Sequence, residues 1–234
     1  SNIDGPYGFI KNPSITGNVG YYVWLGPVTL HAATWNVEIA YERGRIVGNF
    51  ALWGGGEEYD RIGGYYAPAV NTHRSPFSGR NGEYYSEDGF FTGKMAAAEA
   101  RGANDKGFYT YVKHFAINDQ ETNRTGVCTW LNEQSMREIY LKSFEICIKE
   151  SGTKGVMSAL NRLGYTWTGG ERRLLTDVLR NEWGFRGAVV TDSFMGNDSN
   201  LSNVDQMIRA GGSLALGENA KILYNAGTAT TYHY

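Results

Sequence analysis

The sequence predicts an α/β fold, a (β/α) barrel of the TIM type that is incomplete in this chain. Short apolar runs without charge, typical of parallel strands buried on both faces, alternate along the chain with amphipathic helical segments. Polar residues follow several of these runs, as they do at the catalytic face of a barrel, where the carboxyl ends of the strands meet. An open doubly wound sheet is the alternative, but the glycine-rich phosphate loop that usually follows its first strand does not occur.

The expected elements follow from the hydrophobic pattern. The strands share an apolar run that gives way to polar residues, and they are expected at 66–71, 108–115, 155–161, 188–190 and 212–217. The helices share an apolar stripe at helical spacing, and they are expected at 32–47, 90–102, 133–149, 171–183 and 204–210. Thr34 is the expected N-cap of the first helix. The residues expected on the buried face of this helix are Trp35, Val37, Ile39, Ala40 and Ile46. Glu83, Glu87 and Asp88 are expected to cap the second helix.

The domain boundary follows from this count of strands. A closed barrel of eight β/α units takes about 250 residues, and only five or six strands are expected here. The sequence therefore predicts a partial barrel domain over residues 1–217, with material missing before Asp4, after Tyr234 or both. Residues 218–234 are weakly patterned and are expected to form a tail or the start of a linker.

The composition excludes several classes of partner. The net charge is -2 and no block of Lys or Arg occurs, so nucleic acid is not an expected partner. No apolar run approaches the ~20 residues of a membrane helix, so no membrane span is expected. The 31 glycines and 16 tyrosines indicate many tight turns and polar aromatic surfaces. Such surfaces suit sugars, whose C–H faces stack on aromatic rings while their hydroxyls form hydrogen bonds.

The termini and the cysteines bear on location and metal binding. Ser1–Asp4 has neither the charged nor the apolar region of a signal peptide. Cys128 and Cys147 lack metal-binding spacing, and free thiols in a reducing compartment are the simplest interpretation. A cytoplasmic location is therefore favoured over a secreted one, and no metal or other cofactor is expected.

Charged and polar side chains are expected to gather at the strand ends, and these are Asp4, Arg80, Lys113, His114, Asn161 and Asp192. Asp119 and Arg124 join them from the loop after His114. A phosphate site would favour the cations without the buried acid, and a metal site would need more His, Asp or Glu close together. A sugar site, with acceptors and donors for hydroxyls and a carboxylate beneath the anomeric carbon, fits best. Taken alone, Asp192 could instead simply cap the next turn.

At these residues the sequence resembles glycoside hydrolase family 3, in its β-glucosidase-like branch. The matching pieces follow one another in family order and lie at 4–6, 66–88, 113–124, 137–141, 174–187 and 189–192. The resemblance implies that Asp192 is the catalytic nucleophile. It also implies that Asp4, Arg80, Lys113 and His114 bind the sugar hydroxyls. Three further residues are implied as walls of the sugar site, namely Arg124, Met157 and Phe194.

The resemblance implies a retaining β-glycosidase. Such an enzyme would hydrolyse terminal non-reducing β-D-glucosyl residues through a covalent glycosyl-enzyme on Asp192, as in cellulose degradation. The N-acetylglucosaminidase branch is disfavoured, because the loop Ala116–Gln120 lacks that branch's His/Asp pair. Leu160 stands where the family often has an aromatic residue, so one wall of the sugar site is expected to differ.

The second catalytic group is not apparent in the sequence. In this family the acid/base usually lies in an α/β sandwich domain or on a loop outside the barrel. It is therefore expected from a missing domain or from a second chain, and a homo-oligomer is compatible with this expectation. The alternative is a non-catalytic carbohydrate-binding piece or an inactive fragment. Four tryptophans are expected either in the core or as platforms for the leaving group, and these are Trp24, Trp53, Trp130 and Trp167.

Overall fold

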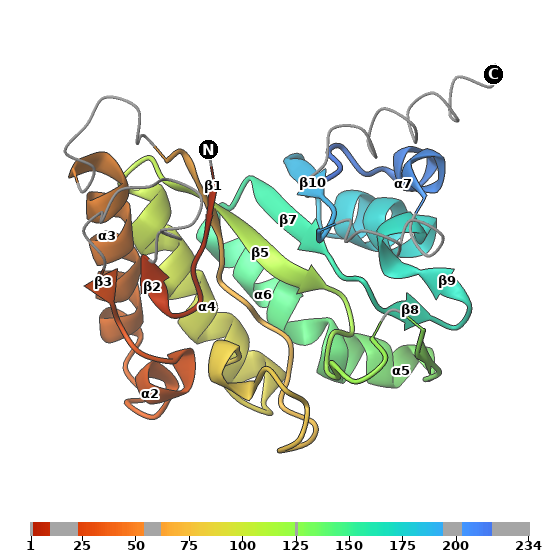
Figure 1. Ribbon diagram of the computed structural model, residues 1–234, viewed down its shortest axis with the longest axis horizontal. Coiled ribbons are helices and arrows are strands. Elements are labelled where there is room, and N and C mark those ends of the chain that lie inside the picture. The colour runs from red at the N-terminus through yellow and green to blue at the C-terminus, as the bar shows by residue number, and fades with distance from the viewer. Residues whose placement is uncertain (1, 10–22, 54–61, 125, 194–202, 217–234) are drawn as a thin grey trace.

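A parallel five-stranded sheet forms the centre of the molecule (Figure 1). The computed structural model describes residues 2–9, 23–53, 62–124, 126–193 and 203–216. The strands run in the order β1 (Asn2–Asp4), β4 (Gly64–Tyr66), β5 (Tyr109–Phe115), β7 (Gly155–Ser158) and β10 (Ala188–Val190). Every neighbouring pair is parallel. The predicted α/β class and its parallel sheet are thus confirmed.

The sheet does not close into a barrel within the described residues, which agrees with the expected incomplete barrel. The strand predicted at 212–217 is reduced to a bridge between Leu214 and Val190. The strand predicted at 66–71 is displaced, because β4 ends at Tyr66 and a bridge from Ala69 to Lys113 continues its path. The boundary predicted at residue 217 stays a prediction, since residues 217–234 lie outside the described part.

The alternation of side chains along the strands separates two faces of the sheet. Val112, Val156 and Val189 pair across β5, β7 and β10 and are buried in the main core. Met157 and Val190, one residue further on, belong to a separate apolar cluster with Tyr111. Because successive side chains of a strand point to opposite faces, the valines face the helices and Met157 faces the other side of the sheet.

Helices cover one face of the sheet. They are α2 (Val28–Ala32), α3 (Val37–Trp53), α4 (Gly89–Asn104), α5 (Glu133–Ser135), α6 (Lys142–Ser151) and α7 (Val204–Ala210). Two segments have π-helical hydrogen bonds, η2 (Met136–Tyr140) and η4 (Arg173–Glu182). Short 3-10 turns occur at η1 (Asn81–Glu83) and η3 (Thr168–Gly170). Figure 1 shows α3, α4 and α6 side by side.

Two small sheets lie outside the central one. The first pairs β2 (Gly8–Phe9) with β3 (Val23–Trp24), antiparallel to each other. The second contains β6 (Cys128–Thr129), β8 (Arg162–Leu163) and β9 (Thr166–Trp167). In the second sheet β6 and β8 are parallel, and β8 and β9 form a hairpin. Since β6 lies in the loop after β5 and β8 in the loop after β7, this sheet holds the two loops side by side.

The helix expected at 32–47 was predicted correctly from residue 37 onward, but its start was wrong. The chain leaves the helix after Ala32, and Trp35 has a left-handed φ of 55°, so α3 begins only at Val37. Thr34 does not cap α3, because its Oγ1 accepts from Asn36 N, and it is Asn36 Oδ1 that accepts from Glu38 N. The caps of α4 were predicted in part, because Asp88 accepts from Phe91 N whereas Glu83 pairs with Arg80.

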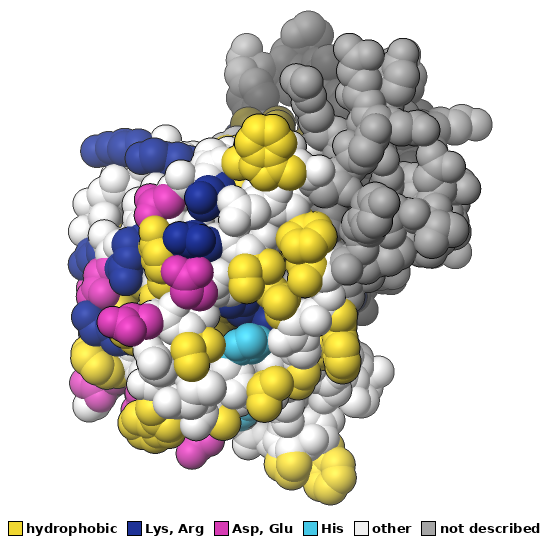
Figure 2. All heavy atoms as spheres, turned by 90° about the vertical axis from the view of Figure 1, so that its left-hand side faces the viewer, with side chains coloured by type: hydrophobic (Ala, Val, Ile, Leu, Met, Phe, Trp, Pro, Cys, Tyr) yellow, Lys and Arg dark blue, Asp and Glu magenta, His cyan; other side chains and the backbone are white. Residues whose placement is uncertain are grey.

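The buried face of α3 also differs from the prediction. Ala40 is buried as expected, but Trp35, Val37, Ile39 and Ile46 are exposed. Figure 2 shows apolar side chains among charged ones on this side of the molecule. The face turned to α4 instead carries small residues. A Cβ on Gly44 would lie 1.9 Å from Glu99 O, so the backbones of α3 and α4 approach too closely for any larger side chain. Glycine therefore marks the packed face here, and the larger apolar residues do not.

Two further observations complete the fold. None of the helices in the described ranges combines the length and the apolar character that crossing a bilayer requires. Cys128 and Cys147 are both free thiols, as the sequence indicated, and Cys147 is buried in the main core.

Candidate active site

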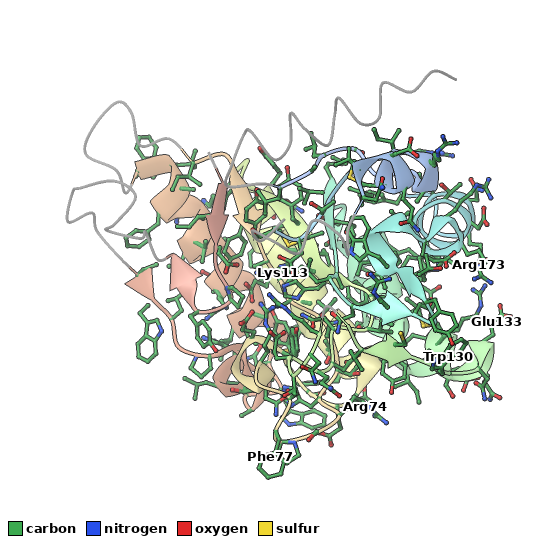
Figure 3. The ribbon with its side chains drawn as sticks, turned by 45° about the vertical axis from the view of Figure 1, so that its right-hand side comes forward. Arg74, Phe77, Lys113, Trp130, Glu133 and Arg173 are labelled. Atoms are coloured by element: carbon green, nitrogen blue, oxygen red, sulfur yellow. The ribbon has the colours of Figure 1, made fainter. Side chains whose placement is uncertain are left out.

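Asp4 and Lys113 form an ion pair at the carboxyl end of the sheet. Asp4 is the last residue of β1, and Lys113 reaches it from β5. The buried Lys113 Nζ donates to Asp4 Oδ1, which also accepts from Gly5 N at 3.1 Å. Partial desolvation acts to raise the pKa of Asp4, but the charge and hydrogen bond of Lys113 outweigh it and the pKa is lowered. Figure 3 shows Lys113 near the centre of the molecule.

Asp192 stands two residues beyond β10 on the same edge of the sheet. Its backbone N donates to Ser158 O at the end of β7, at 3.1 Å, and its Oδ1 accepts from Ser193 N at 2.7 Å. Its Oδ2 is buried and has no hydrogen-bond partner among the described residues. Oδ2 lies 4.0 Å from His114 Nε2, which is beyond hydrogen-bonding distance. This carboxylate therefore presents an uncommitted oxygen beside an imidazole.

His114 is fixed at both of its backbone groups. Asn71 Oδ1 accepts from His114 N at 2.8 Å, and Asn71 Nδ2 donates to His114 O at 3.0 Å. The ring is buried, with its Nδ1 3.4 Å from the hydroxyl of Tyr84. Burial first, and then the positive charges of Arg80, Lys113 and Arg124, hold the His114 pKa well below its usual value. The imidazole is therefore neutral at neutral pH.

Arg80 and Arg124 are joined by carboxylates from two loops. Arg80 Nη2 lies 2.7 Å from Glu83 Oε2, and its Nη1 lies 3.5 Å from Glu121 Oε1. Arg124 Nη1 lies 3.0 Å from Glu121 Oε2. Arg80 was expected at a strand end, and this was wrong, since it lies in the loop between β4 and η1. The charges of both arginines nevertheless act on His114, which places them near the site.

Three predicted site residues remain, and they are Met157, Asn161 and Phe194. Met157, in β7, is buried with Tyr111 and Val190 and forms an apolar surface on the same face of the sheet. Asn161 is buried in the loop after β7, and its Oδ1 has no partner among the described residues. Phe194 lies outside the described residues. No group of three or more His, Cys, Asp or Glu in the described ranges could hold a metal ion.

A comparison with family models identifies the chain. The model of the glycosyl hydrolase family 3 N terminal domain matches residues 24–228. The chain belongs to glycosyl hydrolase family 3. The resemblance inferred from the sequence motifs is thereby confirmed, and the partial parallel sheet is the part of the family 3 N-terminal domain that the described residues form.

Similar proteins in the family are named as β-glucosidases. β-Glucosidase A of Butyrivibrio fibrisolvens is 43% identical over 192 residues, which are 81% of this chain and 22% of that protein. A β-glucosidase of Ruminococcus albus is 41% identical over 164 residues, or 70% of this chain and 17% of that protein. The structure of β-glucosidase 3B from Thermotoga neapolitana in complex with glucose has a TM-score of 0.84 and 38% identity. It covers 95% of this chain and 30% of its own.

The chain spans about a fifth of the length of these curated relatives. Within that fifth, the family 3 domain brings Asp4, Lys113, His114 and Asp192 to the same edge of the parallel sheet. Its β5 strand departs from regular pairing at this edge, with a register shift between Val112 and Phe115. Lys113 and His114 both lie inside this irregular stretch.

Two residues of the candidate site were not predicted from the sequence pattern. Asn71 holds the backbone of His114, and Tyr84 contacts its ring while donating to Asn118 O at 3.1 Å. The sequence did carry a signal for Asn71, because it is a polar residue at the end of the apolar run 66–71. Tyr84 gave no comparable signal.

Proposed function

We propose that the protein is a retaining β-glycosidase of the β-glucosidase type, with Asp192 as its nucleophile. It would hydrolyse terminal non-reducing β-D-glucosyl residues, such as those of oligosaccharides released in cellulose degradation. The observation that carries the proposal is the buried Oδ2 of Asp192, uncommitted among the described residues and 4.0 Å from a neutral imidazole. The names of the β-glucosidase relatives support the substrate class.

The chemistry would proceed in two steps on Asp192. Its carboxylate would attack the anomeric carbon while the bond from that carbon to the leaving oxygen breaks, giving a glycosyl-enzyme. Water would then attack the same carbon, break its bond to Asp192 and give a proton to the group that had protonated the leaving oxygen. This releases the sugar with the same anomeric configuration and restores the Asp192 carboxylate. Because His114 stays neutral, its imidazole can donate a hydrogen bond to a sugar hydroxyl without a charge that would pair with Asp192.

The other site residues would bind the sugar that is cleaved. The paired Asp4 and Lys113 offer an acceptor and a donor side by side, which suits two neighbouring hydroxyls. Arg80 and Arg124 would add donors from the loops, and Met157 would pack against a C–H face of the ring. Phe194 is proposed as a further wall of the same subsite.

The proton for the leaving group would come from a part of the protein outside this chain, such as a missing α/β sandwich domain or a second chain. Asp119, in the loop after β5, accepts from Thr72 N and Thr72 Oγ1, both at 3.1 Å. The other carboxylates of the described site are each paired with a cation, and the pairs are Asp4 with Lys113, Glu83 with Arg80, and Glu121 with Arg124. A nearby cation favours the ionised form of a carboxyl group, so these groups are poorly suited to donate a proton.

A mechanism-based label tests the proposal. A 2-fluoro β-glucoside with a good leaving group should add one sugar mass to the peptide that contains Val189–Asp192 of the full-length protein. Asp192→Asn should abolish the label. Asp4→Asn, which weakens sugar binding but spares the nucleophile, should slow the labelling without moving it. Label found on Glu83 or Glu121 would overturn the assignment of Asp192.

The second candidate function is sugar binding without catalysis. The ion pairing of Asp4, Glu83 and Glu121 favours it, because ion-paired carboxylates and their cations still offer acceptors and donors for hydroxyls. A full-length protein that binds glucose but takes up no label and releases no glucose from aryl β-glucosides would support this second function and exclude the first.

A further inference from the structure

Trp130 lies beside a pocket that the proposed active site does not use. Of the four tryptophans considered in the sequence, Trp167 is buried, whereas Trp130 is 68% exposed. Trp130 lines a pocket of about 470 Å³ together with Asn132, Glu133, Arg173 and Asp177. In Figure 3 Trp130, Glu133 and Arg173 lie together on one side of the molecule, while Lys113 lies near its centre. None of the residues that line this pocket belongs to the site around Asp192.

The small sheet of β6, β8 and β9 holds the Trp130 ring in place. The parallel pairing of β6 with β8 brings Trp130 beside Gly164, at the turn of the β8–β9 hairpin. A Cβ on Gly164 would lie 3.4 Å from the indole Cη2, so the ring rests on this glycine. Tyr165 meets the indole edge to face, with centroids 5.2 Å apart and an interplanar angle of 84°. A ring fixed in this way loses little conformational freedom when a ligand stacks on it.

The pocket has an apolar floor and a charged rim. Met136, Leu163, Leu174 and Val178 contribute apolar side chains to its lining. On the rim, Arg137 bridges two carboxylates, because its Nη1 lies 2.6 Å from Glu182 and its Nε lies 2.9 Å from Glu133.

The two other charged groups on the rim are also paired. Arg173 Nε lies 3.1 Å from Glu171, and Asp177 lies 3.2 Å from Arg172. The rim therefore offers many donors and acceptors without an excess of one sign of charge.

The exposed indole, the apolar lining and the paired charges together favour a neutral polyol as the ligand of this pocket. A phosphate or an acidic peptide would need cations that are not already neutralised by carboxylates. A sugar ring has an apolar C–H face that stacks on an indole, and hydroxyls around its edge that bond to carboxylates and guanidinium groups. The volume of about 470 Å³ falls within the ~300–1,000 Å³ of typical small-molecule sites.

We infer that the pocket beside Trp130 is a second carbohydrate-binding site, which takes a neutral oligosaccharide and is separate from the site of Asp192. The site binds sugar without cleaving it, since it needs no nucleophile. It would hold the full-length protein on oligomeric or polymeric substrates. The inference goes beyond the proposed hydrolysis and does not depend on it.

Calorimetric titration with cellotetraose tests the inference on the full-length protein. Asp192→Asn prevents hydrolysis, and excess glucose occupies the proposed site of Asp192 during the titration. Trp130→Ala should then weaken cellotetraose binding by ~10-fold or more, because an exposed, pre-positioned aromatic anchor is lost. Trp53→Ala is the matched control, since Trp53 is 82% exposed and lies at the end of α3. It should leave the affinity unchanged.

Two further measurements separate this inference from the others. Trp130→Phe, which keeps an aromatic face, should retain most of the affinity and shows that lost binding does not come from misfolding. In the protein with Asp192 intact, Trp130→Ala should hydrolyse a small aryl β-glucoside at the normal rate. Equal cellotetraose affinity in Trp130→Ala and the reference protein would overturn the inference even if hydrolysis is intact. Absent hydrolysis with Trp130-dependent binding would overturn the proposed function alone.

Discussion

Substituting Glu99 with glutamine should destabilise the fold much more than substituting an exposed glutamate, because Glu99 neutralises a buried arginine. Glu99 lies in α4 and is 0% exposed, and its Oε2 lies 3.1 Å from Nε of the buried Arg43 in α3. Its two oxygens also accept from the hydroxyls of Tyr85, at 2.5 Å, and Tyr65, at 3.2 Å. Arg43 in turn donates to Pro6 O at 2.6 Å.

The expected magnitude follows from the charge that would be left behind. Removing one partner of a buried ion pair costs about 3–5 kcal/mol, because the other charge stays buried without compensation. Glutamine keeps the shape of Glu99 and one acceptor oxygen, so the lower end, about 3 kcal/mol, is expected for Glu99→Gln. In a domain of this size each kcal/mol lowers the melting temperature by about 2–4 °C, so a fall of about 6–12 °C is expected.

Thermal unfolding followed by calorimetry measures this difference. Glu150→Gln is the matched control, since Glu150 Oε1 lies 2.6 Å from Lys94 Nζ but both side chains are well exposed. Exposed pairs contribute about 0.2–1 kcal/mol, so this control should lower the melting temperature by at most about 4 °C. Equal losses for Glu99→Gln and Glu150→Gln would refute the account of the buried pair.

Three further predictions concern the site and its loops. Asp192→Asn should lower turnover of an aryl β-glucoside by several powers of ten without lowering the melting temperature, as initial rates and calorimetry would show. Burial raises the pKa of Asp119 from 3.8 to about 6. Between these values the folded protein still binds the proton, whereas the unfolded chain has released it. The free energy of unfolding therefore falls by at most ~3 kcal/mol as the pH rises from about 4 to 6. Asp119→Asn should remove this slope from melting curves, because asparagine does not titrate. Its Oδ1 can still accept from Thr72 N, so the loop keeps this hydrogen bond, and an unchanged slope would contradict the burial argument. The imidazole signals of His114 should not shift in NMR spectra between pH 8 and 6.5, since its pKa lies well below 6.5, and a titration in that range would contradict the neutral His114.

The central sheet was predictable because its signal is local. The apolar runs that became β5, β7 and β10 stand out over three to seven residues, as buried parallel strands do. The four residues Asp4, Lys113, His114 and Asp192 then follow from topology, because parallel strands bring their carboxyl ends to one edge. The place of Arg80 could not be predicted from topology, because this residue lies in a loop. Its ion pairs with Glu83 and Glu121 hold it near the site.

The packing of α3 was not predictable from its own residues. The apolar side chains of this segment indicated one buried face, but of those residues the structure buries only Ala40, together with Gly44 and Val47. The partner helix α4 decides which face of α3 is buried. Gly102 of α4 allows an equally close approach, because a Cβ added to it would lie 2.0 Å from Tyr41 O of α3. A hydrophobic pattern records the character of one helix, whereas close packing depends on small residues in both.

The charges of the site distinguish Asp192 from its neighbours. Asp4 is paired with Lys113, and the glutamates of the two loops are paired with arginines. Asp192 faces a neutral imidazole at 4.0 Å and keeps one oxygen without a hydrogen-bond partner among the described residues. A carboxylate committed to a cation must break that pair before it can attack carbon, whereas an uncommitted one need not. Burial, together with the cations that pair with Asp4, Glu83 and Glu121, holds the His114 pKa low and keeps its imidazole neutral. Asp192 is therefore the carboxylate of this group without an ion pair, which supports its proposed role as the nucleophile.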